Sequence, residues 1–308
     1  METYRLELTQ DGSPTFHSSL FGEACHARQG ALRESRLKFA QPAHRHLAEA
    51  SPLGPIRVLD ACYGLGYNSF SFLDSPEIRG RPVEVLGIEI EAQLLARNQV
   101  MEPVFPSWTE GLARIRAGGI AQREHHSVQV LIGGLEVLYR EPEGPLGRAI
   151  GRGFDLIFHD AFTARKCPEL WCVELFTRYR DLLREGGAVL TYSSAHPVSA
   201  GFIEAGFSVR ETPAVDRRQG GILAVKDGGG NTEGWMKAIH EESTAGAPYR
   251  AKNGEPWTSS PPEVRSRILE GWESEKAERV ARGKETVKRW LKRADSREDG
   301  RHRGHRSW

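Results

Sequence analysis

Five short apolar runs alternate with longer amphipathic segments between Pro55 and Lys226. Short β-branched runs separated by helix-length segments are typical of a parallel sheet with crossover helices. Two further strand-like segments near residue 226 are joined by a turn too short for a helix, so the sheet should end in an antiparallel hairpin. We therefore expect an α/β fold with a mostly parallel sheet. The runs are Ile56–Ala61, Val83–Ile90, Val128–Ile132, Phe154–His159 and Ala188–Tyr192, and the hairpin segments are Phe207–Val215 and Gly220–Lys226.

The 308 residues divide by composition into four regions. Residues 1–50 are expected to form an N-terminal extension that contains a helix, and residues 51–227 hold the sheet. Residues 228–258 follow a glycine-rich stretch and are predicted to be a linker. Residues 259–308 are predicted to be a basic helical tail whose end is disordered.

Charge is concentrated at the C-terminus. The whole chain has a formal net charge of +1, yet residues 276–308 contain twelve Lys or Arg and five Asp or Glu. The sequence thus places a basic arm on a mildly acidic body. Such an arm could contact phosphates of a nucleic acid, or it could simply be a solvated tail.

Composition also excludes several classes of protein. No apolar run approaches the roughly 18 residues needed to cross a bilayer, and residues 1–10 do not resemble a signal peptide, so we expect a cytoplasmic protein without a membrane partner. The four cysteines include no CxxC pair. Two histidine pairs, His44/His46 and His125/His126, lack a third ligand at suitable spacing, so no metal site is expected.

A glycine turn follows the first run. Gly64 and Gly66 allow the backbone to approach a ligand closely, but Ser69 stands where a dinucleotide fingerprint would have a third glycine. Glu89, at the end of the second run, could accept hydrogen bonds from both hydroxyls of a ribose. The two features predict a site for an adenosine-type ligand. A purely structural turn and a solvated strand end are the alternative.

The fourth run ends at Asp160, which should face the same crevice as Gly64 and Glu89 because ligands bind at the carboxyl ends of parallel strands. A carboxylate there could steer an amine and hold its departing proton. Phe162 could stack on a flat base, and Arg165 or Lys166 could meet a phosphate. Alternatively, Asp160 caps the next turn, Phe162 belongs to the core, and the two cations are solvated.

Together these features resemble the class I S-adenosylmethionine-dependent methyltransferases, whose Rossmann-like sheet ends in a reversed hairpin. A narrower resemblance, to the MnmC-type tRNA methyltransferases, covers roughly residues 15–226. It rests on the segment Asp160–Trp171, which has an aspartate, a phenylalanine, a basic residue, a proline and a tryptophan at the family's spacing. The loop Cys62–Asn68 and the stretch Phe16–Glu34 are similar to that family as well.

The resemblance implies the stand-alone form of the enzyme, which methylates the aminomethyl nitrogen of a modified wobble uridine in tRNA to give 5-methylaminomethyl-(2-thio)uridine. A separate enzyme would supply the aminomethyl intermediate. Asp160 would lie between the methyl group and the amine, and Phe162, Arg165 and Lys166 would face the substrate. The residues implied for S-adenosylmethionine are Asp60, Tyr63, Gly64, Gly66, Asn68 and Glu89.

The same sequence features are compatible with other functions. A methyltransferase for a small amine or a protein, or an aminopropyl transferase, would have the same sheet. A catalytically silent RNA-binding module could keep the fold for its shape. The sequence after the third run, Ile132–Leu135, lacks the acid that many such enzymes have there, so recognition of the adenine amino group is not predicted.

Overall fold

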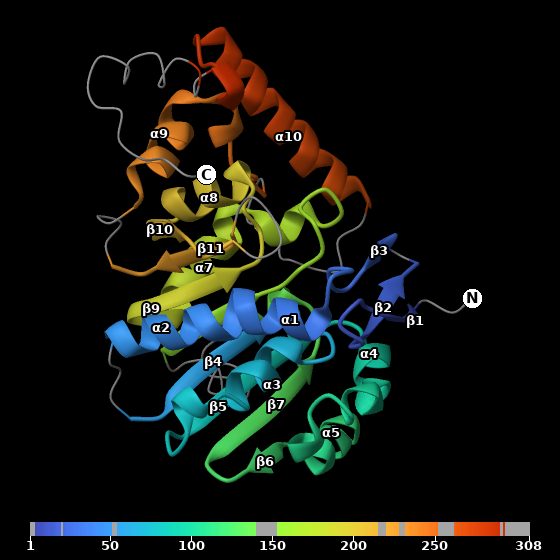
Figure 1. Ribbon diagram of the computed structural model, residues 1–308. Coiled ribbons are helices and arrows are strands. Elements are labelled where there is room, and N and C mark those ends of the chain that lie inside the picture. The colour runs from blue at the N-terminus through green and yellow to red at the C-terminus, as the bar shows by residue number, and fades with distance from the viewer. Residues whose placement is uncertain are drawn as a thin grey trace.

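An eight-stranded sheet forms the centre of the computed structural model (Figure 1). The structure describes residues 4–19, 21–50, 54–139, 153–214, 220–227, 232–251, 262–289 and 292. The strand order is β10-β11-β9-β8-β4-β5-β7-β6. The strands are β4 (Ile56–Ala61), β5 (Val83–Glu89), β6 (Ala121–Arg123), β7 (His126–Ile132), β8 (Phe154–His159), β9 (Leu183–Thr191), β10 (Ser208–Glu211) and β11 (Ile222–Val225).

The pairing within this sheet confirms the expected α/β fold. β4 pairs in parallel with β5 and β8, and β5·β7 and β8·β9 are parallel as well. β11 pairs antiparallel with both β9 and β10, which is the predicted terminal hairpin. The short edge strand β6, antiparallel to β7, is not predicted by the sequence.

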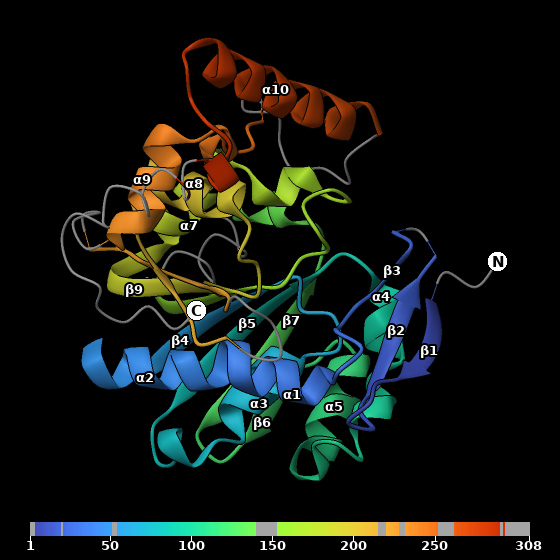
Figure 2. The ribbon, with the colours of Figure 1, turned by 45° about the horizontal axis from the view of Figure 1, so that its top comes forward.

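Helices cover both faces of the sheet, which explains why strands such as β4 and β8 are apolar on both sides (Figures 1 and 2). One core contains side chains of the α-helices that precede β8, and the other contains side chains of the α-helices that follow β8. The α-helices between strands are α3 (Tyr67–Leu73), α4 (Ala92–Ala96), α5 (Thr109–Arg116), α7 (Val173–Leu182) and α8 (His196–Glu204). Short 3-10 helices span Pro76–Ile78, Asn98–Met101, Pro106–Trp108, Leu135–Tyr139 and Pro168–Trp171.

The N-terminal region contains more structure than the sequence predicts. The expected helix is present as a helical run of α1 (Ala31–Ser35), a π-helical turn η1 (Arg36–Ala40) and α2 (Gln41–Ala50). Before it, a three-stranded antiparallel sheet forms beside the start of α1 (Figure 2). Its strands are β1 (Tyr4–Leu8), β2 (Pro14–Ser18) and β3 (Glu23–Ala24).

The region after the sheet differs from the linker that the sequence predicts. It contains the helix α9 (Gly234–Glu242) and a 3-10 turn η7 (Thr244–Gly246), and Met236 and Ile239 of α9 are buried. The glycine-rich stretch before α9 was therefore a poor guide to the structure of this region.

The last described helix, α10 (Pro262–Ala281), packs against the core: Ile268 is buried, and Val264 and Trp272 contact the core. Its four basic and five acidic side chains show that α10 itself is not basic. The basic excess lies further along the chain, in residues 282–308. The predicted disordered end lies outside the described residues. None of the described helices is both long and apolar enough to cross a membrane.

Candidate functional site

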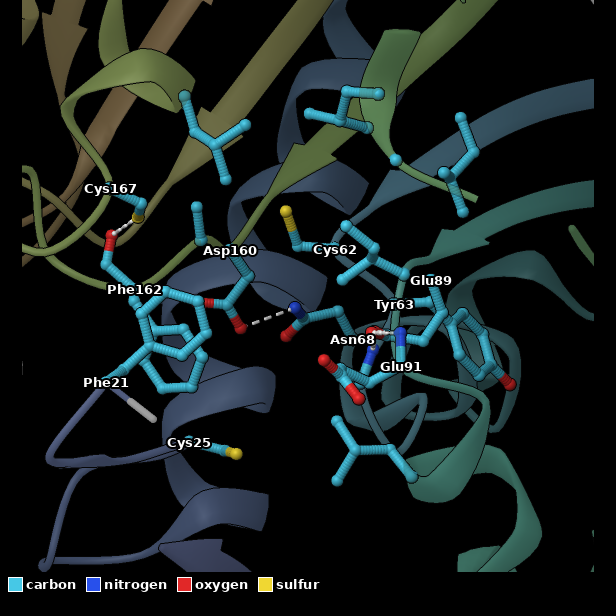
Figure 3. A pocket seen from close by; sticks show the side chains of 18 of the residues that line it. Phe21, Cys25, Cys62, Tyr63, Asn68, Glu89, Glu91, Asp160, Phe162 and Cys167 are labelled. Atoms are coloured by element: carbon cyan, nitrogen blue, oxygen red, sulfur yellow. Dashed lines mark hydrogen bonds between the residues drawn. The ribbon is translucent and has the colours of Figure 1, made fainter. Parts of the chain in front are cut away.

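A cavity opens at the carboxyl ends of β4, β5, β7 and β8, where the sequence predicts a site (Figure 3). We call it the main cavity. Its wall includes Gly64 from the turn after β4, Glu89 at the end of β5, Gly133 after β7 and Asp160 after β8. The structure therefore brings together residues from four separate segments, as the parallel topology requires.

Glu89 is held in one orientation by the backbone. Its Oε2 accepts a hydrogen bond from the Gly64 N–H at 2.7 Å, and its Oε1 accepts one from the Glu91 N–H at 2.8 Å. Burial raises the pKa of Glu89 to about 7, although the two N–H groups act in the opposite direction. The carboxylate is thus fixed on the cavity wall with lone pairs left for a ligand.

Tyr63, which also lines the main cavity, explains the second glycine of the turn. Gly66 does not line the cavity and has a φ of 84°. A Cβ at Gly66 would lie 2.4 Å from the Tyr63 hydroxyl oxygen, and a Cβ at Gly87 would lie 2.5 Å from Cδ2 of the same ring. Gly66 therefore makes room for Tyr63 beneath the turn, while Gly64 is the glycine on the cavity wall.

Asp60 lies beneath the turn rather than on the cavity wall. Its side chain is fully buried, and its Oδ2 accepts a hydrogen bond from the Ser69 hydroxyl at 2.5 Å. Burial raises the pKa of Asp60 to about 8. In this position the carboxylate links β4 to α3.

Asp160 lies on the wall of two cavities. Its Oδ2 accepts a hydrogen bond from the Asn68 side-chain amide at 2.8 Å (Figure 3). Burial, together with the nearby Glu34 carboxylate, raises the pKa of Asp160 to about 7. Asn68, at the start of α3, thus orients the carboxylate that the sequence predicts to be catalytic.

The second cavity, which we call the side cavity, adjoins the main one through Asp160 and Phe162. Its wall also carries Glu23 and Glu34, so three carboxylates line it, and no Lys or Arg is found among the described residues of this wall. Glu23 is tied to the loop after β8, because its Oε1 accepts a hydrogen bond from the Thr163 hydroxyl at 2.7 Å. This side cavity favours a positively charged group.

The other residues predicted to face a substrate have different positions. Phe162 stacks on Phe21 with the ring centroids 4.3 Å apart, and the Arg265 guanidinium lies over the Phe21 ring. Arg165 and Lys166 line neither cavity. The structure therefore supports a position at the site for Phe162 alone among these three.

His26 lines both cavities, and the sequence does not single it out. Its Nδ1 lies 2.9 Å from the Thr15 hydroxyl, and its ring packs edge-on against Tyr67. Burial lowers the pKa of His26 to about 4, so the ring is neutral at physiological pH. The similarity of the stretch Phe16–Glu34 to the MnmC-type proteins was the one signal that could have indicated it.

The described residues contain no group of three His, Cys, Asp or Glu side chains that could hold a metal ion.

The chain is similar to several known proteins in sequence and in fold. Residues 104–227 match the family model described as S-adenosyl-L-methionine-dependent methyltransferase. The crystal structure of MNMC2 from Aquifex aeolicus has a TM-score of 0.69 and 26% sequence identity, and the match covers 89% of this chain and 86% of that one.

Two curated relatives extend the comparison. The tRNA 5-methylaminomethyl-2-thiouridine biosynthesis bifunctional protein MnmC of Aeromonas salmonicida is 27% identical over 232 residues, which are 67% of this chain and 33% of that protein. An uncharacterized protein of Methanocaldococcus jannaschii is 24% identical over 232 residues, 73% of this chain and 60% of the relative. The chain thus spans between a third and three fifths of the length of these relatives.

The chain is therefore similar to S-adenosylmethionine-dependent methyltransferases, MnmC-type proteins among them, and these findings support S-adenosylmethionine as its cofactor.

Proposed function

We propose that the protein transfers a methyl group from S-adenosylmethionine to the aminomethyl nitrogen of a modified wobble uridine in tRNA, giving 5-methylaminomethyl-(2-thio)uridine. The observation that carries the proposal is the position of Asp160 between two cavities of different character. One is suited to a nucleoside cofactor, and the other is suited to a cationic amine.

The main cavity fits S-adenosylmethionine in its chemistry. Glu89 offers a buried, oriented carboxylate for the two ribose hydroxyls. Gly64 and Gly133 allow close approach to the backbone, and Ile88 and Leu135 supply apolar surface for the adenine. We assign no cofactor contact to Asp60 or Gly66, because neither reaches the wall.

The side cavity fits an aminomethyl group. An alkyl ammonium is a cation, and the carboxylates of Glu23, Glu34 and Asp160 would attract it to the side cavity. Lys38 lies behind the wall, where its Nζ forms an ion pair of 2.6 Å with Glu34. Lys38 thus balances the charge of Glu34, while the cavity wall itself carries carboxylates and no Lys or Arg among its described residues. Phe162 offers a ring against which the uracil could stack.

Methyl transfer needs a neutral amine placed in line with the sulfonium methyl that the cofactor supplies. Ionised Asp160 would accept a proton from the ammonium and so free the nitrogen lone pair for the methyl group that S-adenosylmethionine would supply. The Asn68 side-chain amide donates a hydrogen bond to Asp160 Oδ2 and so holds the carboxylate in its orientation. A pKa of about 7 allows Asp160 to accept and release a proton near neutral pH.

The choice of tRNA as the substrate rests on the curated relatives. MnmC proteins are named for biosynthesis of 5-methylaminomethyl-2-thiouridine in tRNA, and we extend that substrate to this chain. The proposal includes a separate enzyme that provides the aminomethyl intermediate, and a cytoplasmic location, where tRNA is modified.

The test uses labelled S-adenosylmethionine with three acceptors: tRNA carrying 5-aminomethyluridine, the same tRNA without the modification, and putrescine. We expect label only in the wobble nucleoside of the modified tRNA. Transfer to putrescine alone would show a small-amine enzyme, since an acidic cavity also suits a diamine. Binding of tRNA without any transfer would show a silent RNA-binding protein, and either result would contradict the proposal.

A further inference from the structure

A surface groove runs along the outer side of the helical region α1–η1–α2. Its wall contains Arg33, Leu37, Gln41 and Arg45 at intervals of four residues, and Ala214 lies in the same groove on the segment after β10. None of the described residues that line the groove is acidic. Arg33 and Arg45 are exposed, so the groove presents positive charge to solvent.

The groove begins next to the acceptor side of the site. Glu34, the neighbour of Arg33, faces inward and lines the side cavity, whereas Arg33 faces the groove. The two faces of α1 therefore separate an acidic interior from a basic exterior. If a polyanion placed a cationic group in the side cavity, its neighbouring phosphates would lie close to the positive charge of the groove.

The dimensions suit a nucleic-acid backbone. Twelve residues separate Arg33 from Arg45, which is about 18 Å along a helix at 1.5 Å per residue. A length of this order is enough to follow several phosphates of a nucleic-acid strand. Arg45 forms no ion pair or hydrogen bond with any residue in the described part of the chain, so its guanidinium is available.

Apart from the basic C-terminal arm, the chain is mildly acidic, so RNA would bind to the body only through a local basic surface. Residues 1–275 contain 30 Lys or Arg and 36 Asp or Glu, so this part of the chain does not attract RNA by net charge. We propose that the groove formed by Arg33, Gln41 and Arg45 is the surface that binds the tRNA backbone next to the modified nucleotide. This inference rests on the proposed function for the identity of the RNA.

The test measures binding of an unmodified tRNA transcript to the full chain by fluorescence anisotropy over a series of salt concentrations. The variants are Arg33→Gln, Arg45→Gln and the double substitution. Each lost phosphate contact should lower the slope of log affinity against log salt by about 0.7 to 0.9. We expect the double variant to bind about tenfold more weakly at low salt.

A matched control is Arg114→Gln, because Arg114 is exposed on α5, away from α2 in both ribbon views. The control should bind tRNA as the unsubstituted protein does, and all variants should keep their affinity for S-adenosylmethionine, which shows that they fold. Equal tRNA affinity and salt slope in the double variant would overturn the inference, and so would an equal loss in the control.

The result is separable from the proposed function. Binding of an unmodified transcript requires no methyl transfer, so weaker binding by the groove variants supports the groove even if the aminomethyl group is not the acceptor. If methyl transfer to the modified tRNA succeeds and the groove variants bind tRNA normally, the proposed function stands and the groove is not the RNA surface. The groove variants would also bind tRNA normally if the groove bound an acidic protein instead, and that outcome would overturn the inference.

Discussion

Glu89 and Asp160 are two buried carboxylates of the same site with pKa values raised to about 7, but they are held in different ways. Glu89 accepts hydrogen bonds from two backbone N–H groups, which belong to the turn after β4 and to the segment after β5. Asp160 accepts one from the side chain of Asn68 and faces the Glu34 carboxylate across the side cavity. The first arrangement suits a fixed ligand for the cofactor, and the second suits a group that gains and loses a proton.

We expect the largest effect on methyl transfer from a substitution of Asp160. Asp160→Asn keeps the shape and the possibility of a contact with Asn68 but removes the proton acceptor. We expect kcat for methyl transfer to fall about 100- to 10,000-fold, with the dissociation constant for S-adenosylmethionine changed less than about threefold. Rapid-mix kinetics and calorimetric titration would measure the two quantities. Equal losses in both would make Asp160 a cofactor ligand, and the contrast with Glu89 would disappear.

Glu89 should give the opposite pattern. Glu89→Ala removes the acceptor of the ribose hydroxyls and also leaves the Gly64 and Glu91 N–H groups without their partner. Hydrogen bonds to charged groups contribute about 1.5 to 3 kcal/mol each, so the dissociation constant for S-adenosylmethionine should rise about 100-fold. At saturating cofactor, kcat should change much less. An unchanged dissociation constant would remove Glu89 from the cofactor site.

A smaller effect is expected from Gly66→Ala. The substitution combines a left-handed backbone with overlap against Tyr63, and it should lower the free energy of unfolding by about 3 kcal/mol. Gly118→Ala is the control, because Gly118 has a φ of 75° but open space around it, so only about 1 kcal/mol should be lost. Urea denaturation measures both. Equal losses would show that Gly66 does not serve to accommodate Tyr63.

The smallest effect concerns pH. Asp160 must be ionised to accept a proton, so kcat should rise with pH and level off above about 7. The Asn68 amide stabilises the ionised form, and its removal in Asn68→Ala should raise the pKa of Asp160 and move the rising limb to higher pH. A pH series of kcat for both proteins tests this. A limb that stays in place would show that Asn68 does not influence the proton affinity of Asp160.

The sequence correctly predicts those site residues whose position depends only on where a strand ends. The ends of parallel strands converge, so Gly64, Glu89 and Asp160 could be assigned to one crevice from the spacing of apolar runs. Asp60 and Gly66 are different, because their roles depend on which way a strand residue points and on how Tyr63 folds under the turn. Neither feature is visible in the pattern of residue types.

The remaining parts of the site come from packing between segments distant in the sequence. His26 and Glu23 reach the cavities only because the small sheet β1–β3 lies beside the loop after β8. Arg165 and Lys166, which the sequence also predicts to face the substrate, come soon after Phe162 in the chain, yet they line neither cavity. Proximity in sequence was a poor guide there, because successive residues of an irregular turn face different directions.

A structure of the protein with S-adenosylhomocysteine and an anticodon stem-loop carrying 5-aminomethyluridine tests the central claim most directly. We expect the ribose hydroxyls on Glu89 and the aminomethyl nitrogen in the side cavity, within about 3 Å of an Asp160 carboxylate oxygen. A nucleoside bound elsewhere, with the side cavity closed to the amine, would contradict it.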